Sequence, residues 1–144
     1  QTKFTLHGVE DTPGIAYKIL GPVNDQDISV DVIVQNISVN GKTDFTFTVD
    51  KEDEEQVKSI LESKQSGLDY IDLLIDADIA KVSIVGAGMR SHAGIASKAF
   101  EALSNESINI QVISTSEIKI TLVIEDKYLE LAVKCLHKAF NLEK

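Results

Sequence analysis

The sequence predicts an α+β protein made of two copies of one unit, in which strands and helices follow the order βαββαβ. Three observations predict this fold class: an internal repeat, period-two alternation of apolar residues typical of strands, and helical spacing of apolar residues between those strands. The chain has 144 residues, of which 43% are hydrophobic and 26% are charged. This composition is typical of a folded globular protein, and the length allows two small domains.

The internal repeat appears at four places, in the same order in both halves of the chain. The matched segments are 3–8 with 81–86, 14–18 with 94–98, 28–34 with 108–114, and 57–60 with 133–136. The offset between the copies changes only in predicted loops, which is typical of a duplicated domain. We therefore expect a first domain at 1–76 and a second at 77–144.

The first copy is predicted to contain both helices and all four strands. The strands are expected at 4–8, 30–34, 45–49 and 70–75, with helices between 15 and 19 and between 57 and 61. Thr12 is the predicted N-cap of the first helix, and Pro13 is its predicted first residue. The Asn40-Gly41 pair tolerates the positive φ angles that a tight hairpin turn needs.

The second copy repeats this order but ends before a final strand. Its strands are expected at 82–86, 108–114 and 118–124, and its helical stripes are Ile95, Ala99 and Leu103, then Leu129, Val133, Leu136 and Phe140. One edge of this sheet is expected to be open unless a strand from residues before Gln1 or from a second chain pairs with it. Antiparallel hairpins with helices on one face of the sheet make each copy a ferredoxin-like sandwich.

Charge and hydropathy exclude two classes of partner. The formal net charge is −9, and the excess of acidic residues lies entirely in the segment that ends at Asp76, so we expect no nucleic-acid partner. No apolar run approaches the roughly 20 residues that cross a bilayer, so we expect no membrane association. The single cysteine, Cys135, can form no internal disulfide, which suits a reducing cytoplasm.

The loop at 10–14 is the candidate binding site. A helix that starts near Gly14 exposes unpaired backbone N–H groups and the positive end of its dipole, which suit a carboxylate. Asp11 beside it could bind an ammonium group, and Gln35 at the end of the next strand could donate or accept a hydrogen bond. A carboxylate and an ammonium together are the head of a free amino acid. The alternative is an ordinary helix start with a surface aspartate.

No catalytic residue, metal ligand or cofactor is predicted. The histidines, His7, His92 and His137, lack the spacing of metal ligands. Cys135 and His137 are two residues apart on a helix and therefore face different directions. The Gly-x-Gly that begins at Gly86 lacks the third glycine of a dinucleotide loop, where Ser91 stands instead. We reject a dinucleotide site on this basis.

A second function remains open from the fold alone, because the same element order underlies an RNA-recognition fold. Phe45 and Phe47 resemble the stacking aromatics of that fold, but the acidic charge and the 6% aromatic content argue against it. Buried strand residues explain these phenylalanines better. The alternative to an amino-acid sensor is therefore a ferredoxin-like RNA-binding or protein-interaction module without a ligand.

Five stretches of the sequence carry a family resemblance. They are Val-Ser-Ile-Val-Gly-Ala-Gly-Met-Arg-Ser-His-Ala-Gly at 82–94, Asn-Ile-Gln-Val-Ile-Ser-Thr-Ser-Glu-Ile-Lys at 109–119, and the shorter segments 8–14, 34–38 and 43–47. The Ile-Ser-Thr-Ser-Glu-Ile run at 113–118 is the most specific of these. Through these motifs the whole chain resembles the regulatory region of aspartokinases, which is built from two ACT domains.

The resemblance implies feedback control, by lysine, threonine or both, of the ATP-dependent phosphorylation of aspartate that leads to these amino acids. The chain would not itself be an enzyme, and its partners would be an aspartokinase catalytic domain or subunit and a second copy of itself in a cytoplasmic homodimer. Relatives carry an extra strand ahead of the region that matches Gln1, and this strand completes the second sheet. The implied effector contacts are Asp11, Gly14, Ile15, Ala16, Asp31, Gln35, Asn109, Ile110, Thr115 and Ser116.

Overall fold

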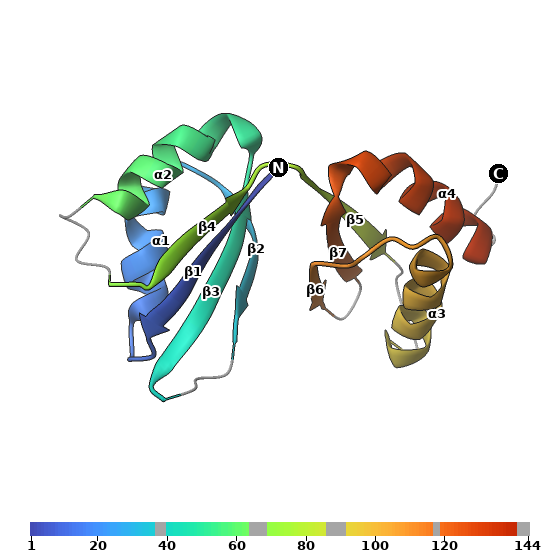
Figure 1. Cartoon of the computed structure of the whole chain (residues 1–144), viewed down its shortest axis with the longest axis horizontal. Helices are drawn as coiled ribbons and strands as arrows, with labels where there is room; N and C mark the ends of the chain where they lie inside the picture. Colours follow the sequence, from blue (N-terminus) through green and yellow to red (C-terminus); the bar gives the residue numbers. More distant parts are fainter. Residues whose placement is uncertain (37–39, 64–68, 86–91, 117–118, 141–144) are drawn as a thin grey trace. The chain divides into compact units, whose positions relative to one another are not determined.

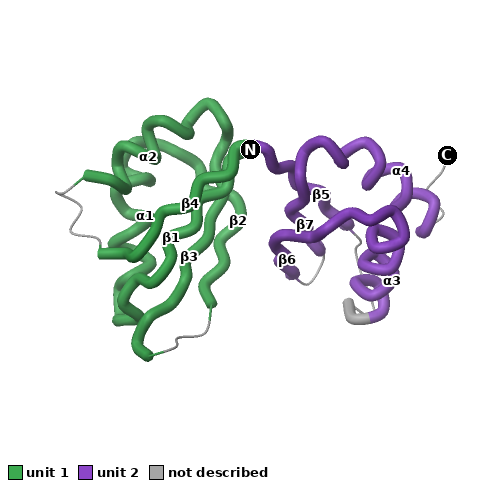
Figure 2. Tube along the Cα trace, viewed as in Figure 1, with its two compact units in different colours: residues 1–77 green, residues 78–144 purple. Residues whose placement is uncertain are grey.

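The chain forms two compact units, Gln1–Ala77 and Asp78–Lys144 (Figure 2). The structure is a computed structural model, and it describes residues 1–36, 40–63, 69–85, 92–116 and 119–140, with the side chains of residues 92 and 93 left out (Figure 1). Both units are antiparallel sheets with helices, so the predicted fold class is confirmed. None of the described helices has both the length and the apolar character needed to cross a membrane.

The first unit has the complete βαββαβ order. Its elements are β1 (Thr2–Glu10), α1 (Ile15–Asp25), β2 (Val30–Gln35), β3 (Lys42–Val49), α2 (Glu54–Glu62) and β4 (Asp72–Asp76). The strands form one antiparallel sheet in the order β2-β3-β1-β4, and both helices lie on the same side of it (Figure 1). Before β3, Asn40 and Gly41 have φ angles of 55° and 74°, the positive values predicted for this pair.

The core of the first unit lies between the sheet and its helices. Alternate residues of β1 and β3 point into it, and Phe4 stacks on Phe47 with ring centroids 5.5 Å apart. Phe45 and Phe47 are 1% and 0% exposed, facing Ile19 of α1 and Leu61 of α2 across the same apolar cluster. These rings have no free face on which a nucleic-acid base could stack, so the resemblance to an RNA-recognition surface is wrong at these two residues.

The second unit has a sheet of three strands among the residues described. Its elements are β5 (Ile79–Val85), α3 (His92–Asn105), β6 (Val112–Thr115), β7 (Lys119–Glu125) and α4 (Leu129–Ala139). The strand order is β5-β7-β6, so within the described ranges no strand lies beside the other edge of β5. The expected strand at 108–114 begins only at Val112. Before it, Ser107 adopts a φ of 57° and Ile108 donates its N–H to Leu103 at 2.9 Å, which closes the end of α3.

The predicted apolar stripe of α4 is only partly correct. Ala132 and Leu136 are its buried residues, whereas Leu129 and Val133 are 39% and 38% exposed. Val133 lines a groove against β5 together with Phe140. Because no described strand extends the sheet beyond β5, nothing in the described part of the second unit covers this side of α4.

Two irregularities interrupt the first sheet, one in β1 between Leu6 and Val9 and one in β2 between Val30 and Ile33. At each of them a side chain from β3 accepts a backbone N–H. Asp44 Oδ1 accepts the N–H of Gly8 at 3.1 Å, and Thr48 Oγ1 accepts the N–H of Val32 at 3.1 Å. A bulge changes the direction in which the neighbouring side chains point. The bulge in β1 lies before the loop that follows this strand, and the bulge in β2 includes the predicted contact Asp31.

Candidate functional site

The chain enters α1 through a tight turn instead of a side-chain cap. Ile15 donates its N–H to the carbonyl of Thr12 at 3.2 Å, and Gly14 has φ 85° and ψ 2°. These are the features of a type II turn, with Pro13 and Gly14 at its central positions. The predictions that Thr12 caps the helix and that Pro13 begins it are therefore wrong, because the Pro-Gly pair favours the turn and α1 begins at Ile15.

This entry leaves backbone donors at the start of α1. The first helical hydrogen bond runs from Lys18 N–H to the carbonyl of Gly14, at 3.0 Å. The N–H groups of Ala16 and Tyr17 have no backbone acceptor within the described ranges. A Cβ atom placed on Gly14 would meet no atom within 4 Å, so a ligand can approach this backbone closely. The positive end of the helix dipole adds to the attraction for a carboxylate.

A pocket of ≈ 200 Å³ opens at this helix start. Its lining residues are Glu10, Thr12, Pro13, Gly14, Ile15, Lys18 and Asp69. Asp11 adjoins this lining, and its N–H donates to the carbonyl of Gly41 at 2.9 Å. The Asp11 carboxylate accepts a hydrogen bond from Gln35 Nε2 at 3.4 Å. The structure thus brings together Asp11 and Gln35, which the sequence predicts as partners in the site, although 24 positions separate them.

Asp31 is the predicted contact of the first unit that lies apart from the others. It is near the start of β2, four residues before Gln35, which is about 13 Å along an extended strand. There it accepts a hydrogen bond from Gln1 Nε2 at 3.3 Å. Ile15 and Ala16, in contrast, form the first turn of α1 beside Gly14.

The predicted contacts of the second unit lie at the two ends of β6. Asn109 is exposed and Ile110 is half-buried, both in the segment that leads into the strand. Thr115 ends the strand, and Ser116 donates its N–H to the carbonyl of Lys119 at 2.7 Å. The glycine-rich loop at 86–91, where we reject a dinucleotide site, lies outside the described residues.

One acidic cluster is close enough to hold a metal ion among the residues described. Carboxylate oxygens of Asp50, Glu52 and Asp53 lie within 4.8 Å of one another in the turn before α2. Asp50 and Glu52 are exposed, as acidic residues at the start of a solvated helix usually are. We assign no metal to this cluster, since acidic side chains at a helix start are explained by the helix dipole.

The environment of Cys135 makes it a poor nucleophile. Burial raises the pKa of its thiol, and the nearby Glu106 carboxylate raises it further. The neutral thiol is therefore favoured at neutral pH, and the thiolate forms only at a higher pH than in a free cysteine. Alkylation by iodoacetamide at about pH 7.5 should be slower than for a free cysteine, with the rate rising only in the alkaline range. A rate equal to that of free cysteine at that pH would contradict this environment.

Comparison with known proteins defines the class to which this fold belongs. Family models described as ACT domains match residues 5–65 and residues 82–140. These two matches fall on the first and second units, so the chain is a tandem ACT-domain protein.

Whole-chain relatives then identify the family. The chain is 57% identical over 143 residues to an aspartate kinase of Pseudomonas putida and 50% identical over 144 residues to an aspartokinase of Helicobacter pylori. It spans about a third of the length of these curated relatives, 35% in each case.

Two solved structures match nearly the full length of this chain, and the match covers nearly the full length of the other chain as well. A structure of aspartokinase alpha and beta subunits is 50% identical with a TM-score of 0.86, and the match covers 97% of this chain and 92% of the other. The ligand-free regulatory subunit of aspartate kinase from Thermus thermophilus is 34% identical with a TM-score of 0.87, and the match covers 96% and 91%. The chain belongs to the aspartokinase family. It corresponds to the regulatory part of an aspartokinase.

Proposed function

We propose that the chain binds a free amino acid, lysine, threonine or both, and that this binding controls the phosphorylation of aspartate by an aspartokinase catalytic domain or subunit. The observation that carries the proposal is the start of α1, where the N–H groups of Ala16 and Tyr17 have no backbone acceptor within the described ranges and Asp11 stands in the loop that leads into the helix. These groups are complementary to the two charges of an amino-acid head.

Each residue of the site then has a role in the proposal. The carboxylate of the effector accepts hydrogen bonds from the amides that follow Gly14, and its ammonium group is attracted to Asp11. Gln35 holds the Asp11 side chain in place through the 3.4 Å hydrogen bond. The lining includes Glu10 and Asp69 but also Lys18, so it carries charges of both signs and leaves lysine and threonine as equal candidates.

We propose further that the functional unit is a cytoplasmic homodimer. Asn109, Ile110, Thr115 and Ser116 of one chain would then complete the site formed by the first ACT domain of its partner. An effector held between two chains binds one arrangement of the dimer better than another, and a connected kinase responds to the shift in population.

Calorimetric titration tests the proposed function against its alternatives. The 144-residue chain is titrated with each proteinogenic amino acid and with a short RNA, and it is assayed for turnover of ATP with aspartate. We expect heat with lysine, threonine or both, and none with RNA or in the turnover assay. RNA binding or turnover would overturn the proposal. Absence of heat with every amino acid, together with an unchanged melting temperature, would leave the ligand-free interaction module in its place.

A further inference from the structure

The bulge in β1 is the feature that orients the candidate loop. Leu6 pairs with Phe45 and Val9 pairs with Thr43, so His7 and Gly8 together lie opposite the single residue Asp44. An extra residue of this kind reverses the inside-outside alternation of the strand. Gly8 makes the reversal possible with a φ of 73°, a conformation that side-chain-bearing residues rarely adopt.

The consequence of the reversal is visible in burial. Leu6 and Val9 are both 0% exposed, although they are three positions apart in one strand. Glu10 and Asp11, which follow, face solvent. Without the bulge, Val9 would point away from the core and the following residues would change sides as well. The direction in which Asp11 leaves β1 therefore depends on the bulge.

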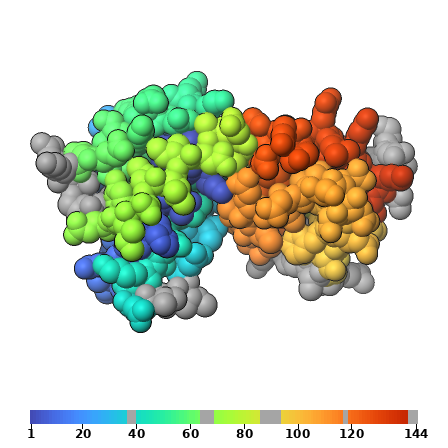
Figure 3. All heavy atoms as spheres, in the orientation of Figure 1, coloured from blue at the N-terminus to red at the C-terminus, as the bar shows by residue number. Residues whose placement is uncertain are grey.

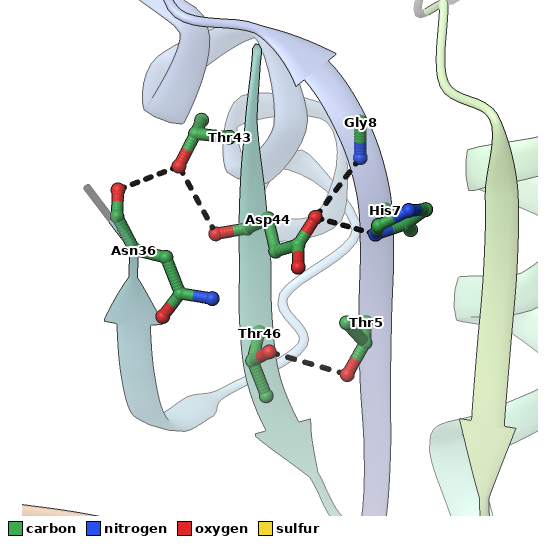
Figure 4. Close-up of polar contacts among 7 residues, drawn as sticks. All are labelled: Thr5, His7, Gly8, Asn36, Thr43, Asp44 and Thr46. Atoms are coloured by element: carbon green, nitrogen blue, oxygen red, sulfur yellow. Dashed lines mark hydrogen bonds and ion pairs between the residues drawn. The ribbon is translucent and has the colours of Figure 1, made fainter. Parts of the chain in front are cut away.

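One carboxylate closes this bulge, as Figure 4 shows. Asp44 Oδ1 accepts the N–H of Gly8 at 3.1 Å and lies 2.6 Å from Nδ1 of His7. A carboxylate only accepts hydrogen bonds, so the imidazole donates from Nδ1. We call His7, Gly8 and Asp44 the bulge clasp. The His7 and Asp44 side chains are 48% and 32% exposed, so solvent screens the attraction between their charges. The hydrogen bond from Gly8 to Asp44 therefore contributes more to closing the bulge than the charge of the pair does.

The bulge clasp is connected to the candidate site on both sides. Beyond it, β1 pairs with β3 up to Glu10, and Asp11 then bonds to the carbonyl of Gly41. On the other side, the Asp44 carbonyl accepts the N–H of Asn36 at 3.0 Å, directly after Gln35. The same residue of β3 thus contacts the strand that leads to Asp11 and the segment that follows Gln35.

We propose that Asp44 is a positioning residue, which closes the β1 bulge and thereby sets the orientation of the loop that carries Asp11 and leads to the α1 amides. Asp44 is not among the residues that line the pocket at α1, so it acts through the backbone. The ligand part of this inference rests on the proposed function, whereas the orientation of the loop does not.

Hydrogen exchange of the unliganded 144-residue chain tests the orientation directly. Asp44→Ala should speed exchange of the Asp11 and Ile15 amides by about tenfold or more. The Asp11 amide bonds to the carbonyl of Gly41 and the Ile15 amide bonds to Thr12 within the turn, and both bonds depend on the loop direction. Asp44→Asn keeps an oxygen acceptor for Gly8 and should restore slow exchange to within about threefold of the original chain. Faster exchange at Gly8 alone, with Asp11 and Ile15 unchanged, would show that Asp44 only satisfies its own neighbour and would overturn the proposal.

Asp72 supplies the matched control. Asp72 lies in β4, where it pairs with His7, and its side chain is exposed. Its substitution by Asn removes one negative charge, as a substitution of Asp44 does. Asp72→Asn should leave the Asp11 and Ile15 amides within about twofold of the original chain. An equal effect of Asp72→Asn and Asp44→Ala would overturn the proposal, because charge near His7 and not closure of the bulge would be the cause. If Asp44→Ala fails to fold, His7→Gln, which weakens the clasp from its other side, replaces it in the same experiment.

The ligand measurement separates this inference from the proposed function. Lysine and threonine are titrated into the original chain, Asp44→Ala, Asp44→Asn and Asp72→Asn. The affinity should fall by about fivefold or more only in Asp44→Ala. Unchanged affinity despite faster loop exchange would overturn the positioning role. If the original chain binds neither amino acid, the proposed function fails, and the exchange result still decides whether Asp44 orients the loop.

Discussion

Substitution of Gly8 by alanine should destabilise the first unit by about 2 kcal/mol or more. Two costs add at this position. A residue with a Cβ atom in the left-handed region costs roughly 1–2 kcal/mol, and Gly8 has a φ of 73°. The new Cβ would also lie 2.5 Å from Cδ1 and 2.8 Å from Cγ1 of Ile71, so that side chain must move. Urea unfolding, followed through amide signals of residues 1–77, measures the loss.

Gly41 provides the matched control for this substitution. It has nearly the same φ, 74°, but a Cβ placed there meets nothing within 4 Å. Gly41→Ala should therefore cost only the conformational part, roughly 1–2 kcal/mol. In addition, Ile71→Ala should recover part of the loss in the Gly8→Ala background. Equal losses for the two glycine substitutions would show that contact with Ile71 contributes nothing.

Reversal of the charge at Asp11 should weaken amino-acid binding by more than about tenfold, which corresponds to about 1.4 kcal/mol. Asp11→Lys removes the proposed partner of the ligand ammonium and puts a like charge in its place. It also removes the acceptor for Gln35, which lies 3.4 Å away. Asp11→Asn should have a smaller effect, because an amide oxygen still accepts from Gln35 while the charge is lost. Calorimetric titration with lysine and threonine measures all three proteins.

Asp25→Lys is the control for long-range electrostatics. It makes the same change in net charge on the same unit, at the far end of α1, where a cation interacts well with the helix dipole. Binding should stay within about twofold of the original chain. If Asp11→Lys and Asp25→Lys weaken binding equally, the cause is the overall negative potential of the first unit and not a contact with Asp11. Unchanged affinity in Asp11→Lys would remove Asp11 from the site.

The candidate site was only partly predictable because its parts depend on different ranges of the chain. The stretch before α1 predicts a loop that leads into a helix near Gly14, and the structure has this loop, although the predicted cap at Thr12 does not form. A proline followed by glycine is compatible with both a capped helix start and a type II turn, and the turn is what forms. The hydrogen bond between Asp11 and Gln35 depends on how β1, β2 and β3 pair, which no local pattern contains.

The sequence by itself determined the duplication, the order of strands and helices, the buried phenylalanines of β3 and the Asn40-Gly41 turn. Each of these depends on a periodicity or a residue preference within a few positions of the chain. The tertiary structure alone decided which side of β1 the residues after Gly8 face, and which side of α4 is covered. The physical reason is that a bulge is set by the partner strand, here through Asp44, and that burial of a helix face depends on whether a strand lies beneath it.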